Sequence, residues 1–542
     1  MRIDYLKITS PFKNLEGFEI DIHEQSMETV LLGLNATGKS NFIEALVIIF
    51  RDLDLERDPI VNDQKKDKLG YYIRYERNSE DKKTKHQIEI EFDITPRKGY
   101  RFTVDGKNVS KKDFWQKKEH YLPRHVFVYY SGLNNRMEEL FHPHRLKYFH
   151  SLTSKDAKYE EFDRLPPLFL VEEVHGSFAL ISFFMFQEFE NETLDFLKEE
   201  LGINEFASTL FKLKKPSWAD SLIKRHGPDP YWHADGLVRR VIEDLNRFAL
   251  APIRAKESIS SNYRKKETVD RLYLYIKDET TLKNFAGLKH QNTIQLFNAL
   301  NSLYVSDFVE KEDIKVNVFK ERENGELVMR ELSEGEKQLL TVLGMLKFTK
   351  DEESLILLDE PDTHLNPLWK WKYLDYIDRV VKRPESTQII FCTHDPLVIG
   401  NMKKEQVQIF KRDKKTMAFT PDVSPRELGV AGILTSPMFG LPNTISHYAN
   451  EKLKERNSLL QKENESKLTA EEQNRLSELF DELNKMGFTQ TFKDPLYSSF
   501  IVAYEKYLEE QKSNLKWQES ESSEHEKSTA YKVLMKLLEK KK

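Results

Sequence analysis

One segment of the chain has the residue types and the spacing of a phosphate-binding loop. Residues 33–40 read Gly-Leu-Asn-Ala-Thr-Gly-Lys-Ser, after an apolar run and before a helical pattern. Glycines let backbone N–H groups turn inward around phosphate oxygens, and the helix that follows adds its positive end. Lys39 is expected to reach the β- and γ-phosphates, and the Ser40 hydroxyl to complete the ligands of Mg²⁺. The pattern predicts a nucleotide site made of Asn35, Ala36, Thr37, Gly38, Lys39, Ser40 and Asn41.

A second segment places two carboxylates directly after an apolar run. Residues 355–358 are Leu-Ile-Leu-Leu, and Asp359 and Glu360 follow. Continuous apolar runs are typical of parallel strands buried on both faces, and α/β proteins bind ligands at the carboxyl ends of such strands. Asp359 is therefore expected to hold Mg²⁺ through water, and Glu360 to polarise the attacking water as a general base. The structural alternative is a buried strand followed by acidic surface residues.

Two further segments have a structural explanation when each is taken alone. Residues 332–338 read Leu-Ser-Glu-Gly-Glu-Lys-Gln and open an amphipathic helix, in which Ser333 and Glu336 form a capping box. His394 follows an apolar run at 389–391, and a lone histidine at the end of a strand is more often structural than catalytic. The order of these segments after the phosphate-binding loop is what favours a functional role.

In this order the motifs resemble those of the ABC-type ATPases: a phosphate loop, a signature Ser-x-Gly-x-x-Gln, an apolar strand ending in Asp-Glu-Pro, and a Thr-His pair. The resemblance implies an ABC-type P-loop ATPase head that uses ATP and Mg²⁺. In that family two heads face each other, so Ser333 and Gly335 would contact the γ-phosphate held by the opposite chain. His394 would sense the γ-phosphate and steady the attacking water, and residues 362–366 would touch the partner chain. A head-to-head dimer or a higher even oligomer is expected.

Less specific segments resemble the ATPase subunit of Septu-type anti-phage systems, including the form linked to retrons. They are residues 126–136, 429–441 and 493–497. This resemblance implies control of a separate HNH-type nuclease, and the retron-linked form would add a reverse transcriptase and an RNA–DNA hybrid. The alternative is a RecF- or SMC-like DNA-repair ATPase that binds DNA directly. A transporter motor fits less well, because Glu334 stands where transporters carry Gly.

One family element has no clear counterpart in the sequence. ABC-type ATPases usually carry a glutamine in a loop between the phosphate-binding loop and the signature. The loop after residues 129–132 (Tyr-Tyr-Ser-Gly) is the candidate segment for it.

Contacts with nucleic acid must come from local patches, because 84 Lys and Arg against 89 Asp and Glu leave a net charge of −5. The candidate clusters are Lys212, Lys214 and Lys215; Arg264, Lys265 and Lys266; and Lys411, Arg412, Lys414 and Lys415. The middle cluster is favoured, since Tyr263, Tyr273 and Tyr275 lie near it and aromatic rings stack on bases. Ordinary solvated surface is the alternative for each cluster.

The strands and helices that the sequence predicts around these residues indicate an α/β fold. Apolar or alternating runs predict strands at 28–32, 87–93, 124–130, 314–319, 326–329, 355–358 and 389–391. Asn324-Gly325 predicts a tight turn between the strands 314–319 and 326–329. Apolar residues at helical spacing predict helices at 42–53, 194–201, 237–248 and 476–483.

Four regions are expected along the chain. Residues 1–149 and 314–420 would form the N- and C-terminal lobes of an ATPase head, with a helical insertion at 150–313 and a helical C-terminal region at 421–542. The single cysteine, Cys392, cannot form an internal disulfide, which fits a reducing cytoplasm. The longest apolar run, at 178–186, is far short of the ~20 residues that span a bilayer, so no membrane insertion is expected.

Overall fold

The computed structural model divides the chain into two compact units, Met1–Leu441 and Pro442–Lys542. It describes residues 1–23, 27–57, 69–79, 84–95, 98–132, 134–187, 190–260, 266–321, 326–348, 353–380, 386–441, 443–464 and 468–486. None of the helices among these residues is long and apolar enough to cross a membrane.

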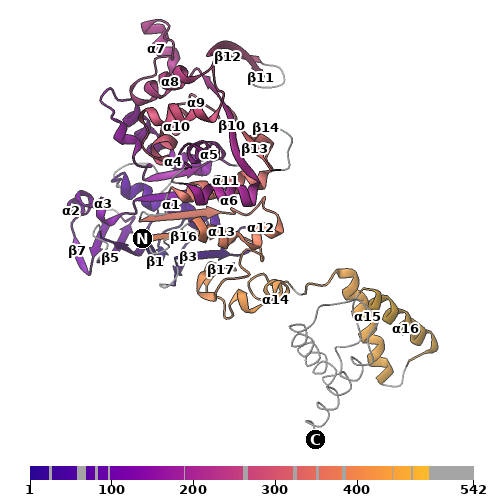
Figure 1. The fold of residues 1–542 in the computed structure, drawn as a ribbon. Coiled ribbons are helices and arrows are strands. Elements are labelled where there is room, and N and C mark those ends of the chain that lie inside the picture. Colours follow the sequence, from indigo (N-terminus) through magenta and orange to yellow (C-terminus); the bar gives the residue numbers. More distant parts are fainter. Residues whose placement is uncertain are drawn as a thin grey trace, which may run out of the picture. The chain divides into compact units, whose positions relative to one another are not determined.

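A sheet of parallel strands forms the centre of the first unit (Figure 1). Its strands lie in the order β18 (Thr416–Phe419), β17 (Val407–Arg412), β3 (Glu28–Leu32), β16 (Thr387–Cys392), β15 (Ser354–Asp359), β8 (His125–Tyr130) and β9 (Leu168–Val171). All neighbours pair in parallel except β18, which pairs antiparallel to β17. The predicted strands at 28–32, 124–130, 355–358 and 389–391 are confirmed. Their carboxyl ends consequently meet at one edge of the sheet.

Two hydrophobic cores flank this sheet, and β15 shows why its strands are apolar throughout. Leu355 and Leu357 belong to one core, and Ile356 and Leu358 to the other, because successive side chains point to opposite faces. The first core also holds α1 (Lys39–Asp54) and the inner face of a second, antiparallel sheet. That sheet has the strand order β2 (Glu19–Asp21), β1 (Arg2–Ile8), β4 (Tyr71–Asn78), β5 (Lys85–Asp93), β6 (Gly99–Val104) and β7 (Lys107–Val109).

Among the described residues, seven further α-helices of the first unit lie outside the region 150–313 or, in the case of α4, extend across its start. They are α2 (Lys111–Gln116), α3 (Lys118–Tyr121), α4 (Arg136–Thr153), α11 (Glu334–Lys347), α12 (Pro367–Trp371), α13 (Tyr373–Val380) and α14 (Val430–Thr435). The predicted boundary at 149/150 falls inside α4, so it does not separate two compact parts of the chain.

The region 150–313 contains the helices that its periodicity predicts, but it also contains strands that the sequence did not predict. It contains α5 (Glu173–Met185), α6 (Asn191–Leu201), α7 (Ala219–His226), α8 (Gly236–Phe248), α9 (Glu279–Lys289) and α10 (Thr293–Val305). It also contains β9 of the central sheet and the long strands β10 (Ile203–Lys214), β11 (Ile253–Ser260) and β12 (Lys266–Ile276). These strands were missed because their alternation lies between strongly amphipathic helices and resembles a continuation of them.

A third sheet joins this region to the chain that follows. Its strand order is β11-β12-β10-β13-β14, with β13 at Ile314–Lys320 and β14 at Glu326–Val328. The pairing of β13 with β14 confirms the predicted antiparallel pair, whereas the Asn324-Gly325 turn lies outside the described residues. The predicted boundary at 313/314 therefore separates two strands that pair within one sheet.

The second unit, in the part that is described, is a helical hairpin. Helix α15 (His447–Asn464) packs against α16 (Ala470–Lys485) through Leu459, Leu476 and Leu479. The helix predicted at 476–483 is confirmed. Residues 421–441, which the sequence assigned to this C-terminal region, belong to the first unit, and residues 493–497 lie outside the described part of the chain.

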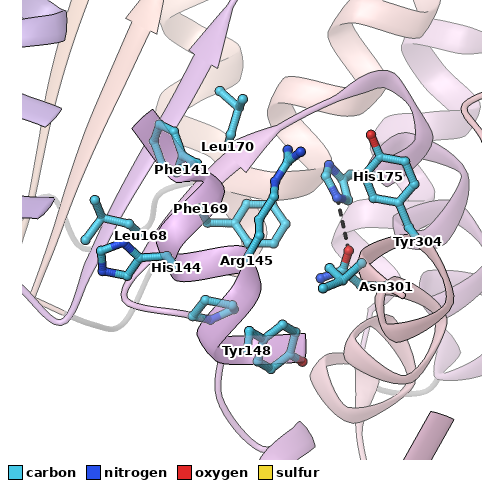
Figure 2. A pocket seen from close by; sticks show the side chains of 12 residues that line it. Phe141, His144, Arg145, Tyr148, Leu168, Phe169, Leu170, His175, Asn301 and Tyr304 are labelled. Atoms are coloured by element: carbon cyan, nitrogen blue, oxygen red, sulfur yellow. Dashed lines mark hydrogen bonds between the residues drawn. The ribbon is translucent and has the colours of Figure 1, made fainter. Parts of the chain in front are cut away.

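A buried polar cluster links the central sheet to the helices of region 150–313 (Figure 2). The Glu172 carboxylate, at the start of α5, accepts hydrogen bonds from Arg145 of α4 and Tyr304 of α10. The Glu172 backbone N–H donates to Nδ1 of His175 at 2.8 Å, so the neutral ring carries its hydrogen on Nε2, which faces Asn301 Oδ1 at 3.2 Å. Burial lowers the pKa of His175 to about 4.

The buried His175 predicts a loss of stability in mild acid. The unfolded chain binds this proton near the ordinary pKa of about 6.5, whereas the folded chain binds it only near 4, so stability falls as the pH drops through this window. The shift corresponds to about 3 kcal/mol. His175→Gln keeps one acceptor and one donor but does not titrate, so its free energy of unfolding should fall less than the wild type's between pH 7 and pH 4. Denaturant titrations at these pH values measure the free energy of unfolding. An equal fall for the wild type and for His175→Gln would contradict this assignment.

Candidate functional site

The predicted phosphate-binding loop connects the end of β3 to the start of α1, as the sequence analysis expected. Gly33 has φ 153° and Gly38 has φ 110°, values that L side chains rarely adopt. A Cβ at Gly33 would lie 2.5 Å from the backbone oxygen of Phe410, and one at Gly38 would lie 2.9 Å from Leu15 Cδ2. Both positions therefore favour glycine by conformation, and Gly33 also by space, because the atom that its Cβ would meet is backbone.

Lys39 and the residues around the loop hold the loop through two groups of hydrogen bonds. The buried Lys39 ammonium donates to the carbonyl of Gly33 at 2.6 Å, so the positive charge of Lys39 lies next to the backbone of the loop. Asn41 donates to Asn14 Oδ1 at 2.7 Å, and Asn14 donates in turn to the carbonyl of Ala36 at 3.1 Å. Arg136 approaches from α4 and donates to Asn41 Oδ1 at 3.4 Å. Asn14 was missed by the sequence analysis, because no local pattern marks it.

Asp359 lies at the carboxyl end of β15 and is almost completely buried. Burial raises the pKa of its carboxyl group, while the hydrogen bond with Ser40 lowers it and the neighbouring Glu360 carboxylate raises it again. Within the described part of the chain, Asp359 Oδ1 has no hydrogen-bond partner. A buried carboxylate oxygen beside a serine hydroxyl is the kind of oxygen donor set that Mg²⁺ prefers.

Glu360 and His394 come together from the ends of two neighbouring strands. His394 Nδ1 lies 3.3 Å from Glu360 Oε1, and the two side chains are 56% and 31% exposed. Glu360 has φ 51°, the left-handed conformation, which costs a non-glycine residue about 1–3 kcal/mol. Its N–H donates to the carbonyl of Cys392 at 3.0 Å, so the strained residue is tied to the strand that carries His394.

The predicted signature segment forms the amino end of α11. Ser333 is the N-cap: its Oγ accepts from the Glu336 N–H at 3.3 Å, and its own N–H donates to Glu336 Oε2 at 2.7 Å, which confirms the capping box. Among the described residues, no hydrogen bond or ion pair joins Ser333 or Gly335 to the loop 33–41. The structure therefore brings together the residues of the phosphate-binding loop, Asp359, Glu360 and His394, but not these two signature residues.

The loop after Glu360 differs in part from the expectation that residues 362–366 face a partner chain. Asp362 is buried and accepts a hydrogen bond from Thr393 Oγ1 at 2.9 Å, and burial raises its pKa to about 6. Leu365 is buried as well, whereas Thr363, His364 and Asn366 are exposed. Asn366 caps α12 by accepting from the Trp369 N–H at 2.9 Å. Only part of this loop is therefore available for an intermolecular contact.

The basic clusters differ in how far their charge is neutralised. Lys214 pairs with Asp307 and Glu310, and Lys215 pairs with Asp220. The Lys212 ammonium lies 5.9 Å from the ring centre of Tyr273. Of the favoured middle cluster, residues 263–265 and the side chain of Lys266 lie outside the described part of the chain. The cluster of Lys411, Arg412, Lys414 and Lys415 is exposed around the turn between β17 and β18.

Gly335 provides a stability test of the contact between α11 and the loop after Glu360. A Cβ at Gly335 would lie 2.6 Å from the backbone oxygen of His364, so Gly335→Ala must displace one of the two segments and should cost about 1–3 kcal/mol. Gly287→Ala, within α9, is the matched control, because a Cβ there meets no atom within 4 Å and alanine favours a helix by ~1 kcal/mol. Thermal unfolding should give a lower midpoint for Gly335→Ala and a higher one for Gly287→Ala. Equal midpoints for the two variants would show that α11 is not packed this tightly.

Comparisons with known proteins point to the same class of protein. Residues 234–400 match the family described as "AAA domain, putative AbiEii toxin, Type IV TA system". The chain is 24% identical over 213 residues to the Septu protein PtuA of Bacillus mycoides strain KBAB4, covering 38% of this chain and 30% of that protein. It is 26% identical over 162 residues to the Septu protein PtuA of Bacillus thuringiensis, covering 27% of this chain and 40% of that protein. The chain thus spans less than half the length of either relative.

Solved structures that align with the chain include two SMC head domains. The head domain from Pyrococcus furiosus, solved with an extended coiled coil and the C-terminal domain of ScpA, aligns with TM-score 0.33 and 14% identity over 79% of this chain and 97% of that chain. The head domain from Thermotoga maritima aligns with TM-score 0.30 and 12% identity over 78% of this chain and all of that chain. Together, these matches make the chain similar to an AAA domain family over residues 234–400 and to Septu proteins over part of its length.

Proposed function

We propose that the chain binds ATP with Mg²⁺ and hydrolyses it to ADP and phosphate between two copies that face each other. The observation that carries this proposal is the buried, unpartnered Oδ1 of Asp359 beside Ser40, at the same sheet edge as Lys39 and the Glu360–His394 pair. A buried carboxylate oxygen without a partner is costly, and a cation that binds with the nucleotide removes that cost.

Each residue of the site has a distinct part in the proposed reaction. The Lys39 ammonium exchanges the loop carbonyl for the β- and γ-phosphate oxygens, and Ser40 and Asp359 hold Mg²⁺, which neutralises charge on the phosphates. The Glu360 carboxylate is partly exposed at the strand end and accepts the proton of the attacking water. His394, in contact with Glu360, orients that water and the γ-phosphate. The left-handed backbone of Glu360 holds the carboxylate at this edge.

The second half of the site is proposed to come from the opposite chain. The amino end of α11 presents N–H groups and the positive end of the helix dipole around Ser333 and Gly335, and this arrangement suits an anion. Among the described residues, no hydrogen bond or ion pair joins them to their own loop 33–41. Leu34, at the tip of that loop, is 72% exposed, which leaves the nucleotide side of the loop open to another surface.

The biological role is proposed from the relatives alone. Because two sequence relatives are Septu proteins, the chain is proposed to act in anti-phage defence by controlling a partner HNH-type nuclease. A retron-linked form of the system would add a reverse transcriptase and an RNA–DNA hybrid as partners. The exposed cluster of Lys411, Arg412, Lys414 and Lys415 supports the second candidate function, a DNA-repair ATPase that binds DNA directly. Purification with and without a co-expressed nuclease, followed by salt-dependent DNA binding, distinguishes the two functions.

Lys39→Ala should remove nucleotide binding, because the phosphates lose the only cation that the loop itself supplies. Binding of labelled ATP to the purified variant measures this directly. Lys7→Ala is the control, since Lys7 lies on β1 and forms a solvent-exposed ion pair with Glu19 of β2. ATP affinity that is unchanged in Lys39→Ala would rule out the proposed site.

Glu360→Gln should bind ATP normally but hydrolyse it about 10²–10⁴-fold more slowly, the usual effect of losing a general base. The glutamine keeps the size of the side chain but cannot accept the proton. The variant should accumulate as an ATP-bound dimer, which light scattering would detect. Normal turnover by this variant would place the base elsewhere.

Ser333→Arg should stop hydrolysis while the same chain still binds ATP, because Ser333 is proposed to serve the opposite nucleotide. Mixing Ser333→Arg with Lys39→Ala should then restore turnover, since the mixed pair contains one site with an intact loop and an intact signature. A mixture that stays inactive, or a Ser333→Arg chain that no longer binds ATP, would contradict the shared site.

A further inference from the structure

We infer that Gln338 is a positioning residue, which connects the amino end of α11 to the backbone of Glu360 and so makes the proposed base depend on the state of the signature helix. The inference rests on the proposed function, in which Glu360 is the base and α11 contacts the nucleotide of the opposite chain. It concerns a residue that contacts neither nucleotide nor metal in that proposal.

Gln338 lies one turn inside α11 and is only 5% exposed. Its Oε1 accepts a hydrogen bond from the His364 N–H at 3.0 Å. Its Nε2 donates to the hydroxyl of Tyr129, at the end of β8, at 3.1 Å, and to the carbonyl of Glu360 at 3.4 Å. Both ends of this buried amide are therefore used, and they join three segments that are far apart in the sequence.

The carbonyl that Gln338 contacts belongs to the strained residue. Glu360 has φ 51°, and its carbonyl also accepts from Thr363 Oγ1 at 2.8 Å. A left-handed residue persists only when its surroundings hold both of its peptide groups. Of the described hydrogen bonds to the turn 360–364, those from Gln338 are the ones that come from α11.

The packing beside Gln338 makes this link stiff. Gly335 lies so close to His364 that a Cβ there would be 2.6 Å from its backbone oxygen. The amino end of α11 and the turn 360–364 therefore cannot slide past each other without breaking the Gln338 hydrogen bonds. If α11 shifts when Ser333 contacts a γ-phosphate, the Gln338 hydrogen bonds would transmit that shift to the backbone of Glu360 and so move its carboxylate.

The test compares Gln338→Leu with Gln388→Leu in the full chain. Gln388 is an equally buried glutamine on β16 whose amide bonds the backbone of Ile3, far along the strand from its carboxyl end. Gln338→Leu should lower kcat about ten- to a hundred-fold, the effect of misplacing a reacting group by about 1 Å, and leave KM for ATP within about two-fold. Gln388→Leu should leave both constants at wild-type values.

A double variant separates positioning from general damage. In the Glu360→Gln background, Gln338→Leu should cause no further loss of turnover, because the group that it positions is already absent. Additive losses, or a loss that appears in KM and not in kcat, would overturn the inference. If Glu360→Gln itself retains normal turnover, the proposed base is wrong; if Glu360→Gln is slow but Gln338→Leu is normal, only the role of Gln338 is wrong.

Tyr129→Phe keeps the inference testable if Gln338→Leu fails to fold. This variant removes only the hydroxyl that accepts from Gln338 Nε2 and leaves α11 unchanged. It should lower kcat by a few-fold at constant KM, since the amide loses one of its anchors. Unchanged kcat in a folded Tyr129→Phe protein would overturn the inference.

Discussion

The parallel pairing of the central strands is the constraint on which the rest of the structure depends. Neighbouring strands lie about 4.8 Å apart, so the ends of β3, β16 and β15 are fixed within one or two strand spacings of each other. The loop after β3 is thereby brought to His394 after β16 and to the Asp359–Glu360 pair at the end of β15, which are more than 300 residues away in the sequence. Two hydrophobic cores, one on each face, keep this sheet in place.

Electrostatics then distinguish the two carboxylates at that edge. Asp359 is enclosed beside Ser40, and burial raises its pKa, so a nearby cation would stabilise its ionised form. Glu360 points to a more open position and faces His394. Adjacent residues on one strand thus have different environments, because side chains alternate in direction and the backbone changes to a left-handed conformation at Glu360.

The buried polar contacts around α5 and α11 tie the nucleotide edge to the region 150–313. Glu172, directly after β9, contacts Arg145, His175 and Tyr304, while Gln338 joins α11 to the turn after β15. Buried polar groups that are fully paired favour one arrangement over others. The head and the region 150–313 therefore form one compact unit, although the whole of that region had been expected to be an inserted, mostly helical unit.

The sequence by itself determined the phosphate-binding loop, the Asp359–Glu360 strand and the capping box at Ser333, because each depends on residues within one turn or one strand. It predicted the central strands, since continuous apolar runs occur where both faces of a strand are buried. Only the tertiary structure decided that Asp362 turns inward, that Asn14 supports the loop, and that Gln338 reaches Glu360. It also placed β10 to β12 in a sheet, which no local period distinguished from the helices beside them. Contacts of this kind join residues that are distant in the sequence. Packing decides which of these residues meet, and a short stretch of sequence does not contain that information.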